Sequence, residues 1–330
     1  MVRIATKRIS AALVFVLLGV VISVNAQPTA KVHRIGYLSS LSAVGGAPQF
    51  DAVRQGLRDL GYVEGRTIII EPRWADGNYD RLPALAKELV SLNPELIVSA
   101  GGPPPARALK SLTSTIPVVF ISGSAMAAGI VSNLGRPGAN LTGLEVFAEE
   151  LDTKRLELLK ELLGKPARIA VLWNPGNLQG SLQRRELESS GQAQGMDLRF
   201  VEAKRPADLE PAFARIRQER VDAILVCADP MLTGEYRQVV ALVTQTRLPA
   251  MYPFRSDAAA GGLISYGTDL FAVYRNAAIY VDKILTGTKP AELPVQQPTR
   301  FELVINLKTA KELGLTIPLP LMLRADHLIR

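Results

Sequence analysis

Polar and aromatic residues follow several of the apolar runs in this 330-residue chain, and their types suit the binding of a small molecule. Hydroxyls and backbone amides at the starts of helices are suited to a carboxylate or another small anion. An acid, an amide and aromatic rings could take an ammonium group and an apolar side chain. The first half of the chain supplies Ser39, Ser40, Ser42, Gly101, Gly102, Gly123 and Ser124, and the second half Asn174, Asp229, Tyr252 and Tyr266.

Each of these candidates also has a purely structural interpretation. Serines that follow a strand often cap the next helix, and paired glycines can simply permit a tight turn. Asn174-Pro175 and Asp229-Pro230 are typical of turns. The two tyrosines could complete the core beneath a loop. The binding interpretation is favoured because both halves of the chain place such residues directly after predicted strands.

Residues suited to catalysis are scarce. The only histidines are His33 and His327, which lie near the two ends of the chain that follows residue 26. The only cysteine, Cys227, follows an apolar run that predicts burial. A Ser/His/Asp triad, a histidine-rich metal site and a disulfide framework are therefore poorly supported. The chain also lacks a G-x-G-x-x-G fingerprint. We expect no catalytic residues, no metal and no cofactor, and we expect that the protein is not an enzyme.

The charges do not predict a nucleic-acid partner. The chain has 38 Lys and Arg against 31 Asp and Glu, and the two signs are interspersed, as in 54–64 and 154–161. Solvated helix faces account for this pattern better than a basic stripe would.

Short β-rich runs alternate with amphipathic segments, a rhythm that predicts parallel sheets covered by helices on both faces. The predicted strands are 33–38, 67–71, 96–99, 117–122, 169–173, 197–201, 223–227, 250–252, 263–266 and 301–306. The predicted helices are 47–60, 81–92, 104–112, 151–163, 182–194, 207–217, 234–246, 270–285 and 308–313. Residues 141–146 are expected to lead into the helix at 151, and Pro318 and Pro320 to mark an extended tail. Because ligands bind beyond the carboxyl ends of parallel strands, the residues listed above should gather there.

The first 26 residues resemble a cleaved secretory signal. Arg3, Lys7 and Arg8 precede the apolar run 11–24, and Ala26 supplies a small residue before Gln27. The apolar run is shorter than the roughly 20 residues that a bilayer anchor needs, and no cysteine follows it to accept lipid. We expect an exported protein that is not a lipoprotein; an uncleaved anchor is the alternative.

The mature sequence resembles the periplasmic substrate-binding proteins of ABC transporters, in the group related to tryptophan- and other amino-acid-binding proteins. The resemblance covers nearly all of it and is carried mostly by scaffold segments. These are Arg34–Leu38, Gly56–Gly65, Glu71–Gly77, Pro117–Phe120, Arg136–Gly143, Lys154–Lys160, Val171–Pro175 and Leu313–Pro318.

The resemblance implies an α/β fold, the type I periplasmic binding protein fold, with two Rossmann-like lobes joined by three hinge strands. The N-terminal lobe would comprise 27–146 plus 262–290, and the C-terminal lobe 147–261 plus 291–330. It also implies that Ser39, Ser40, Gly101, Gly102 and Gly123 hold a ligand carboxylate and that Asp229 holds an amine.

The expected function is therefore a periplasmic receptor that delivers a small ligand to the membrane permease of an ABC importer. We expect it to be a monomer. An amino acid or a related carboxylate is the expected ligand; an aromatic acid or a sugar derivative fits the same pattern. Two alternatives remain open at this point. One is a ligand-sensing partner of a membrane signalling protein, and the other is an exported α/β enzyme.

Overall fold

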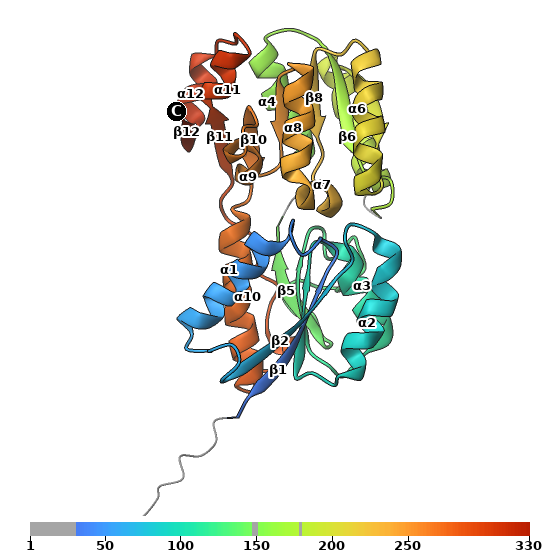
Figure 1. Ribbon diagram of the computed structural model, residues 1–330, viewed down its shortest axis with the longest axis vertical. Helices are drawn as coiled ribbons and strands as arrows, with labels where there is room; N and C mark the ends of the chain where they lie inside the picture. Colours follow the sequence, from blue (N-terminus) through green and yellow to red (C-terminus); the bar gives the residue numbers. More distant parts are fainter. Residues whose placement is uncertain (1–30, 147–150, 178–179) are drawn as a thin grey trace, which may run out of the picture. The chain divides into compact units, whose positions relative to one another are not determined.

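Two mostly parallel sheets organise the residues that this computed structural model describes, 31–146, 151–177 and 180–330 (Figure 1). The predicted signal, residues 1–26, lies outside them. The first half of the chain runs β1 (His33–Ser39), α1 (Ala47–Asp59), β2 (Ile68–Trp74), α2 (Leu82–Ser91), β3 (Leu96–Ala100), α3 (Pro103–Leu112), β4 (Val118–Ser122) and β5 (Leu141–Glu145). The second half runs α4 (Asp152–Leu163), β6 (Arg168–Trp173), α5 (Gly180–Gln194), β7 (Asp197–Glu202), α6 (Leu209–Gln218), β8 (Ala223–Val226), α7 (Pro230–Gly234), α8 (Tyr236–Thr246), β9 (Ala250–Tyr252), α9 (Arg255–Ala259), β10 (Ile264–Gly267), α10 (Leu270–Leu285), β11 (Glu302–Asn306), α11 (Leu307–Glu312), α12 (Leu319–Arg324) and β12 (His327–Ile329). Single 3₁₀ turns lie at Tyr79–Arg81 (η1), Pro206–Asp208 (η3) and Pro290–Glu292 (η4).

The first sheet has the strand order β2-β1-β3-β4-β5, and each of these neighbouring pairs is parallel. Side chains alternate between its faces, as they must in a strand. Ile35 and Tyr37 of β1 join the core formed with α1 and α10, whereas Leu38 joins the core formed with α2 and α3. Helices therefore cover both faces (Figure 1), as the apolar runs predicted.

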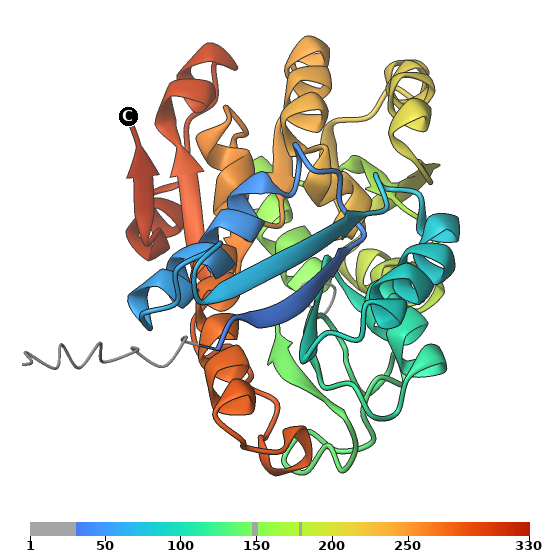
Figure 2. The same ribbon diagram turned by 60° about the horizontal axis from the view of Figure 1, so that its bottom comes forward.

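Helix α10 returns to the first sheet from far along the sequence and packs beside α1 (Figure 2). A Cβ added to Gly56 would lie 2.3 Å from the carbonyl oxygen of Arg275 and 2.7 Å from the Cβ of Ala278. Only glycine allows the two helices to approach this closely. The contact places the first turns of α1 and α10 at the same edge of the sheet.

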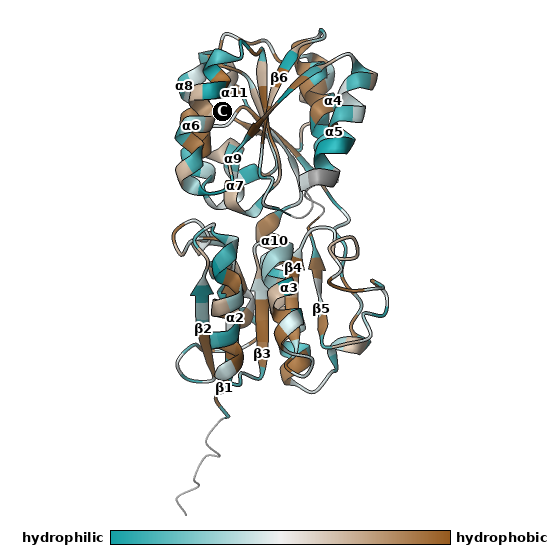
Figure 3. Ribbon diagram, turned by 90° about the vertical axis from the view of Figure 1, so that its right-hand side faces the viewer, coloured by the Kyte–Doolittle hydropathy of each residue, from teal (hydrophilic) through white to brown (hydrophobic). Residues whose placement is uncertain are grey.

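The second sheet has the order β12-β11-β10-β9-β8-β6-β7, and within the described residues only the β10–β11 pair is antiparallel. Ile169 and Val171 of β6 face α4 and α5, while Ala170 and Leu172 face α6 and α8. Figure 3 shows the mostly hydrophobic strands of this sheet between helices that carry many hydrophilic residues. Cys227, at the end of β8, is fully buried in the first of these two cores, as its apolar run predicted.

The structure corrects three predicted elements. Residues 141–145 form the edge strand β5 rather than a lead-in to the next helix. The helix predicted at 234–246 begins two residues later, at Tyr236, as α8, and a separate short helix, α7, precedes it. The tail predicted to be extended contains α12 and β12. Pro318 and Pro320 do not prevent this helix, because they lie at its N-terminus. The first backbone N–H groups of a helix have no partner within the helix, so their absence in proline has no cost there.

The predicted lobe boundaries need two corrections, although Val32–Arg330 form one compact unit. Strand β10 belongs to the second sheet, so the return to the first lobe begins with α10 and not at residue 262. Leu293 and Val295 are buried in the first lobe, and Gln296 pairs with Leu144 of β5, so that lobe extends beyond residue 290. Within the described residues, the chain passes between the sheets three times: after β5, after β10 and before β11.

Candidate functional site

Loops at the carboxyl ends of both sheets line a cavity of about 40 Å³. Since one water needs roughly 10–15 Å³ on such a measure, the cavity has room for only a few waters. The first lobe lines it with Leu41, Gln49, Gly101, Gly102, Ile121, Gly123, Val146, Leu270 and Tyr274. The second lobe lines it with Ala228, Asp229, Pro230, Thr233 and Phe254.

Asp229 is the carboxylate of this cavity, and its position follows from local sequence. It precedes Pro230, caps the N-terminus of α7 and accepts hydrogen bonds from the backbone N–H groups of Met231 (2.9 Å) and Leu232 (3.2 Å). An aspartate before a helix that begins with proline is a strong N-cap. The side chain is only 3% exposed.

Three further side chains donate to the same carboxylate. Asn174 donates to Oδ1 (3.1 Å), and Asn177 and the Tyr79 hydroxyl donate to Oδ2 (3.2 and 3.1 Å). Burial raises the pKa of Asp229, and these hydrogen bonds oppose that rise. A carboxylate offers about four lone-pair sites, so these five donors already occupy it fully. Its expected contact with a ligand amine stays a prediction.

Contacts between the two lobes surround the cavity. Tyr79, in η1 of the first lobe, donates to Asp229 and accepts from the Met231 N–H (3.2 Å) in the second. A Cβ added to Gly45 would lie 2.1 Å from the Gly234 carbonyl oxygen, and one added to Gly102 would lie 2.6 Å from Pro230 Cγ. Small residues therefore allow the lobes to close over the cavity.

The paired glycines at the end of β3 have a conformational role. Gly101 and Gly102 have φ angles of 76° and 85°, in the left-handed region that favours glycine. The Gly101 N–H donates to the Tyr274 hydroxyl (3.0 Å), and the Gly102 N–H donates to the Ile121 carbonyl (3.3 Å). Residues 103–105 are prolines and have no N–H. The expected carboxylate contact at Gly101 and Gly102 remains a prediction, and these two amides already have partners.

The predicted serines hold the turn after β1 and do not line the cavity. Ser39 Oγ accepts from the Leu41 N–H (3.1 Å), Ser40 Oγ donates to the Gly101 carbonyl, and Ser42 Oγ accepts from the Gly45 N–H (3.0 Å). Ser39 and Ser40 are fully buried. Ser124, with a φ of 46°, follows the cavity residue Gly123. The geometry thus supports the capping and turn interpretation of the serines.

The predicted tyrosine pair does not flank the cavity. Tyr252 is 1% exposed and belongs to the core beneath α8. The Tyr266 ring packs near Phe301, with ring centroids 6.1 Å apart. Both side chains point into the second lobe's own packing, so the apolar wall of the cavity is provided instead by Phe254 and Leu270.

Sequence reasoning missed Gln49 and Tyr274, which line the cavity from the first turns of α1 and α10. A signal was present for Gln49. The buried positions of α1 are Gln49, Val53, Gly56 and Leu57, so a polar residue occupies the apolar stripe at helical spacing. Burial raises the pKa of Tyr274 to about 12, which keeps its hydroxyl protonated.

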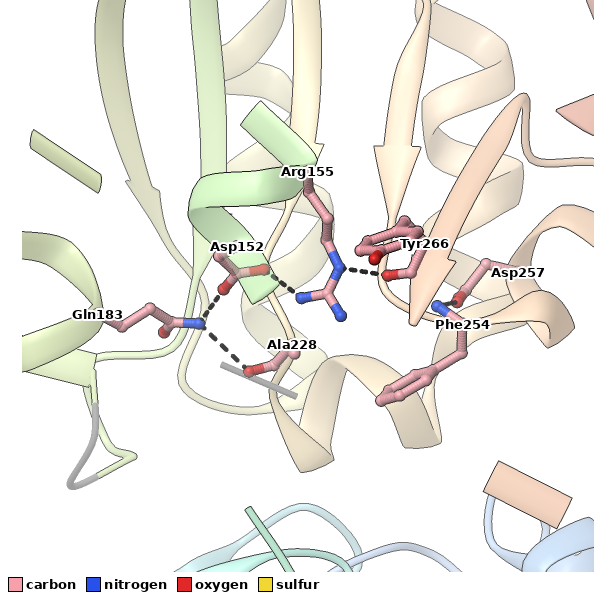
Figure 4. A network of polar contacts seen from close by, with 7 residues as sticks. All are labelled: Asp152, Arg155, Gln183, Ala228, Phe254, Asp257 and Tyr266. Atoms are coloured by element: carbon pink, nitrogen blue, oxygen red, sulfur yellow. Dashed lines mark hydrogen bonds and ion pairs between the residues drawn. The ribbon is translucent and has the colours of Figure 1, made fainter. Parts of the chain in front are cut away.

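A buried polar network supports the cavity wall of the second lobe (Figure 4). Arg155, fully buried, donates to Asp152 and to the Tyr266 carbonyl (2.7 Å). Gln183 donates to Asp152 and to the carbonyl of Ala228 (3.4 Å). The Asp257 carboxylate accepts from the Phe254 N–H (3.0 Å). The network therefore fixes the backbone of two cavity residues.

Two α/β lobes that share a cavity at the carboxyl ends of their sheets define a solute-binding protein. Residues 40–329 match the family of ABC transporter substrate binding proteins, and the chain belongs to that family. No curated protein sequence matches it.

Solved structures agree with this fold. A conserved domain protein from Vibrio cholerae is 29% identical, covers 90% of this chain and 100% of its own, and has a TM-score of 0.82. A Streptococcus pneumoniae ABC domain in complex with L-Trp is 24% identical, covers 91% and 100%, and has a TM-score of 0.80. A 5-methylthioribose-bound solute-binding protein from Thermotoga lettingae is 15% identical, covers 90% and 92%, and has a TM-score of 0.63.

Proposed function

We propose that this chain captures an amino acid or a related carboxylate between its lobes and delivers it to the permease of an ABC importer. The observation that supports an amine-bearing ligand is the charge of the cavity. Its described lining contains Asp229 and no Lys, Arg or His. A single buried carboxylate attracts an ammonium group and repels an anion, so amine-bearing members of the class are favoured.

Closure is the proposed signal to the permease. A ligand shifts the equilibrium towards the closed state only by interacting better with that state than with the open one. The cavity is lined by both lobes and has a volume of only about 40 Å³. A ligand that enters the open form and contacts both walls would therefore stabilise closure.

A thermal-shift screen tests this proposal. Purified mature protein would be melted with each amino acid, and with amines and carboxylic acids of the same side chains. A ligand present at a hundred times its dissociation constant adds about 2.7 kcal/mol to stability, which is a readily measured increase in Tm. The proposal predicts such an increase for at least one amino acid. A screen in which no amino acid or related carboxylate raises Tm would refute the ligand class.

We also propose that residues 1–26 direct export and are then removed, leaving a freely diffusing, monomeric periplasmic receptor that binds and does not catalyse. The charged start, apolar run and small residue at position 26 support this proposal. None of the helices in the described residues combines the length and apolarity that a bilayer crossing requires. Cell fractionation with mass spectrometry of the purified N-terminus tests it, since a mature chain beginning at Gln27 is expected.

A further inference from the structure

The side chain of Gln49 lines the cavity and carries a buried polar atom that has no hydrogen-bond partner among the described residues. Gln49 is 4% exposed, and the atom is its Oε1. A buried acceptor without a partner is costly, and native proteins rarely retain one without a reason. A ligand that supplies a donor would satisfy it.

We infer that Gln49 is the direct hydrogen-bond acceptor for the amine of the ligand and so determines its specificity. This inference rests on the proposed function and deepens it. The alternative acceptor, Asp229, is already occupied by the α7 backbone, two asparagines and Tyr79. Binding an amine there would break one of those bonds, whereas binding at Gln49 breaks none that the structure shows. Asp229 contributes its charge, and Gln49 contributes the contact.

The surroundings of Gln49 define the rest of the ligand. Leu41, Ile121, Val146, Phe254 and Leu270 give the cavity an apolar wall. The Tyr274 hydroxyl accepts from the Gly101 N–H (3.0 Å), which leaves its own proton to donate. The ligand class that fits is an amine on an apolar body, with an acceptor group that Tyr274 can reach. A carboxylate is compatible with this arrangement but is not sufficient for binding.

Isothermal titration calorimetry on the full mature chain tests the inference with three matched sets of probes. They are L-leucine, isopentylamine and 4-methylvaleric acid; L-phenylalanine, phenethylamine and 3-phenylpropionic acid; and L-tryptophan, tryptamine and indole-3-propionic acid. In at least one set, the amino acid and the amine should bind more tightly than the acid that lacks the amine. Gln49→Met, which keeps the shape and removes the acceptor, should weaken amine binding at least tenfold.

Two controls separate a contact from a structural role. Gln55→Met changes the same residue type on the same helix at an exposed position, where Gln55 donates to Asp59 and accepts from Arg58 at the surface, and should leave binding within twofold. The ligand-free Gln49→Met protein should melt at the wild-type temperature or above it, because an unsatisfied buried acceptor has been removed. A lower melting temperature would indicate a structural role and overturn the inference.

The outcomes distinguish the two proposals. Wild-type binding that survives Gln49→Met within twofold refutes the role of Gln49 and leaves the proposed function intact. Binding only of the acids that lack an amine also overturns the inference, while the carboxylate class survives. If no probe binds the wild-type protein, the proposed ligand class fails and the inference fails with it.

Discussion

Buried charged side chains control the stability of the second lobe. Asp152, Arg155 and Asp257 are each at most 3% exposed, and they lie behind the cavity wall. Burial raises the pKa of Asp152 despite the attraction of Arg155, and burial raises the pKa of Asp257 to about 7. Both aspartates therefore bind a proton more tightly in the folded chain than in the unfolded chain.

This linkage predicts how Asp257→Asn changes the pH dependence of stability. A carboxyl whose pKa rises from 3.8 to about 7 on folding stabilises the fold fully below pH 3.8 and loses that contribution as pH rises through 7. Asparagine can still accept from the Phe254 N–H. The variant should be more stable than wild type by about 1–3 kcal/mol at pH 8, with little difference at pH 4. Urea denaturation at pH 4 and pH 8 measures the difference in the free energy of unfolding between the variant and wild type. An equal difference at the two pH values would contradict the prediction.

Removing one partner of the Asp152–Arg155 ion pair should destabilise the protein more than replacing both partners with apolar residues. Arg155→Met leaves the buried Asp152 without its cation and should destabilise the protein by about 3 kcal/mol. The double variant Asp152→Leu/Arg155→Met removes both charges and should be more stable than the single variant. Denaturant titration of the two proteins tests this, and equal or additive losses would show that the charges do not act as a pair.

At the scale of elements, the starts of two short segments determine how the lobes touch. Helix α7 begins at Pro230 under the cap of Asp229, and η1 presents Tyr79 to that cap from the other lobe. Helix α3 begins with three prolines, so its first turn offers packing surface rather than N–H donors. The two lobes are thus linked here by one tyrosine and by apolar contact.

Tyr79→Phe should weaken closure more than folding. It removes the bond to Asp229 and the bond from Met231, at about 0.5–1.5 kcal/mol each, so a ligand that drives closure should bind roughly tenfold more weakly. Calorimetry with a probe identified in the thermal-shift screen measures the change. Tyr62→Phe removes a hydroxyl bonded to Asp282 within the first lobe and serves as the control. Equal effects on binding from the two variants would count against the role of Tyr79.

At the scale of the whole molecule, function depends on backbone surfaces that meet across the cavity. Gly45 belongs to the first lobe and Gly234 to the second, and a Cβ on Gly45 would meet the Gly234 carbonyl. Gly45 has no positive φ, so alanine adds steric bulk there without backbone strain. This position separates closure from folding more cleanly than Gly102, whose φ of 85° adds a conformational penalty.

Gly45→Ala should hinder closure while leaving each lobe folded. With saturating ligand, small-angle X-ray scattering should show a smaller decrease in radius of gyration than in wild type, and affinity should fall about tenfold, or roughly 1.4 kcal/mol. The control is Gly135→Ala on an exposed loop, where an added Cβ would lie 3.5 Å from its nearest heavy atom, Asn133 Oδ1. A wild-type decrease in radius of gyration for Gly45→Ala would show that the two lobes do not close in this way.

The sequence predicted most strands and helices because buried strands are continuous apolar runs and the helices place apolar residues at helical spacing. Residues 35–38 and 169–172 are apolar throughout, as strands covered on both faces must be. Gly101, Gly102, Gly123 and Asp229 were predicted for the site and do line the cavity. Tyr252 was also predicted for the site but lies in the core, because an aromatic residue after a strand is equally suited to either position. Gln49 was missed because its helix looked like an ordinary amphipathic one.

The α/β class, the two successive sheets and the family scaffold could be predicted from the sequence, since they depend on local periodicity and on short segments such as Arg136–Gly143. Only the tertiary structure decided that α10 returns beside α1, that Tyr79 meets Asp229 and that Gln49 faces the cavity. Those contacts join residues 150 or more positions apart, and the two helices pack through glycine backbone surfaces. A local pattern cannot specify such contacts, because they depend on how the lobes come together around the cavity.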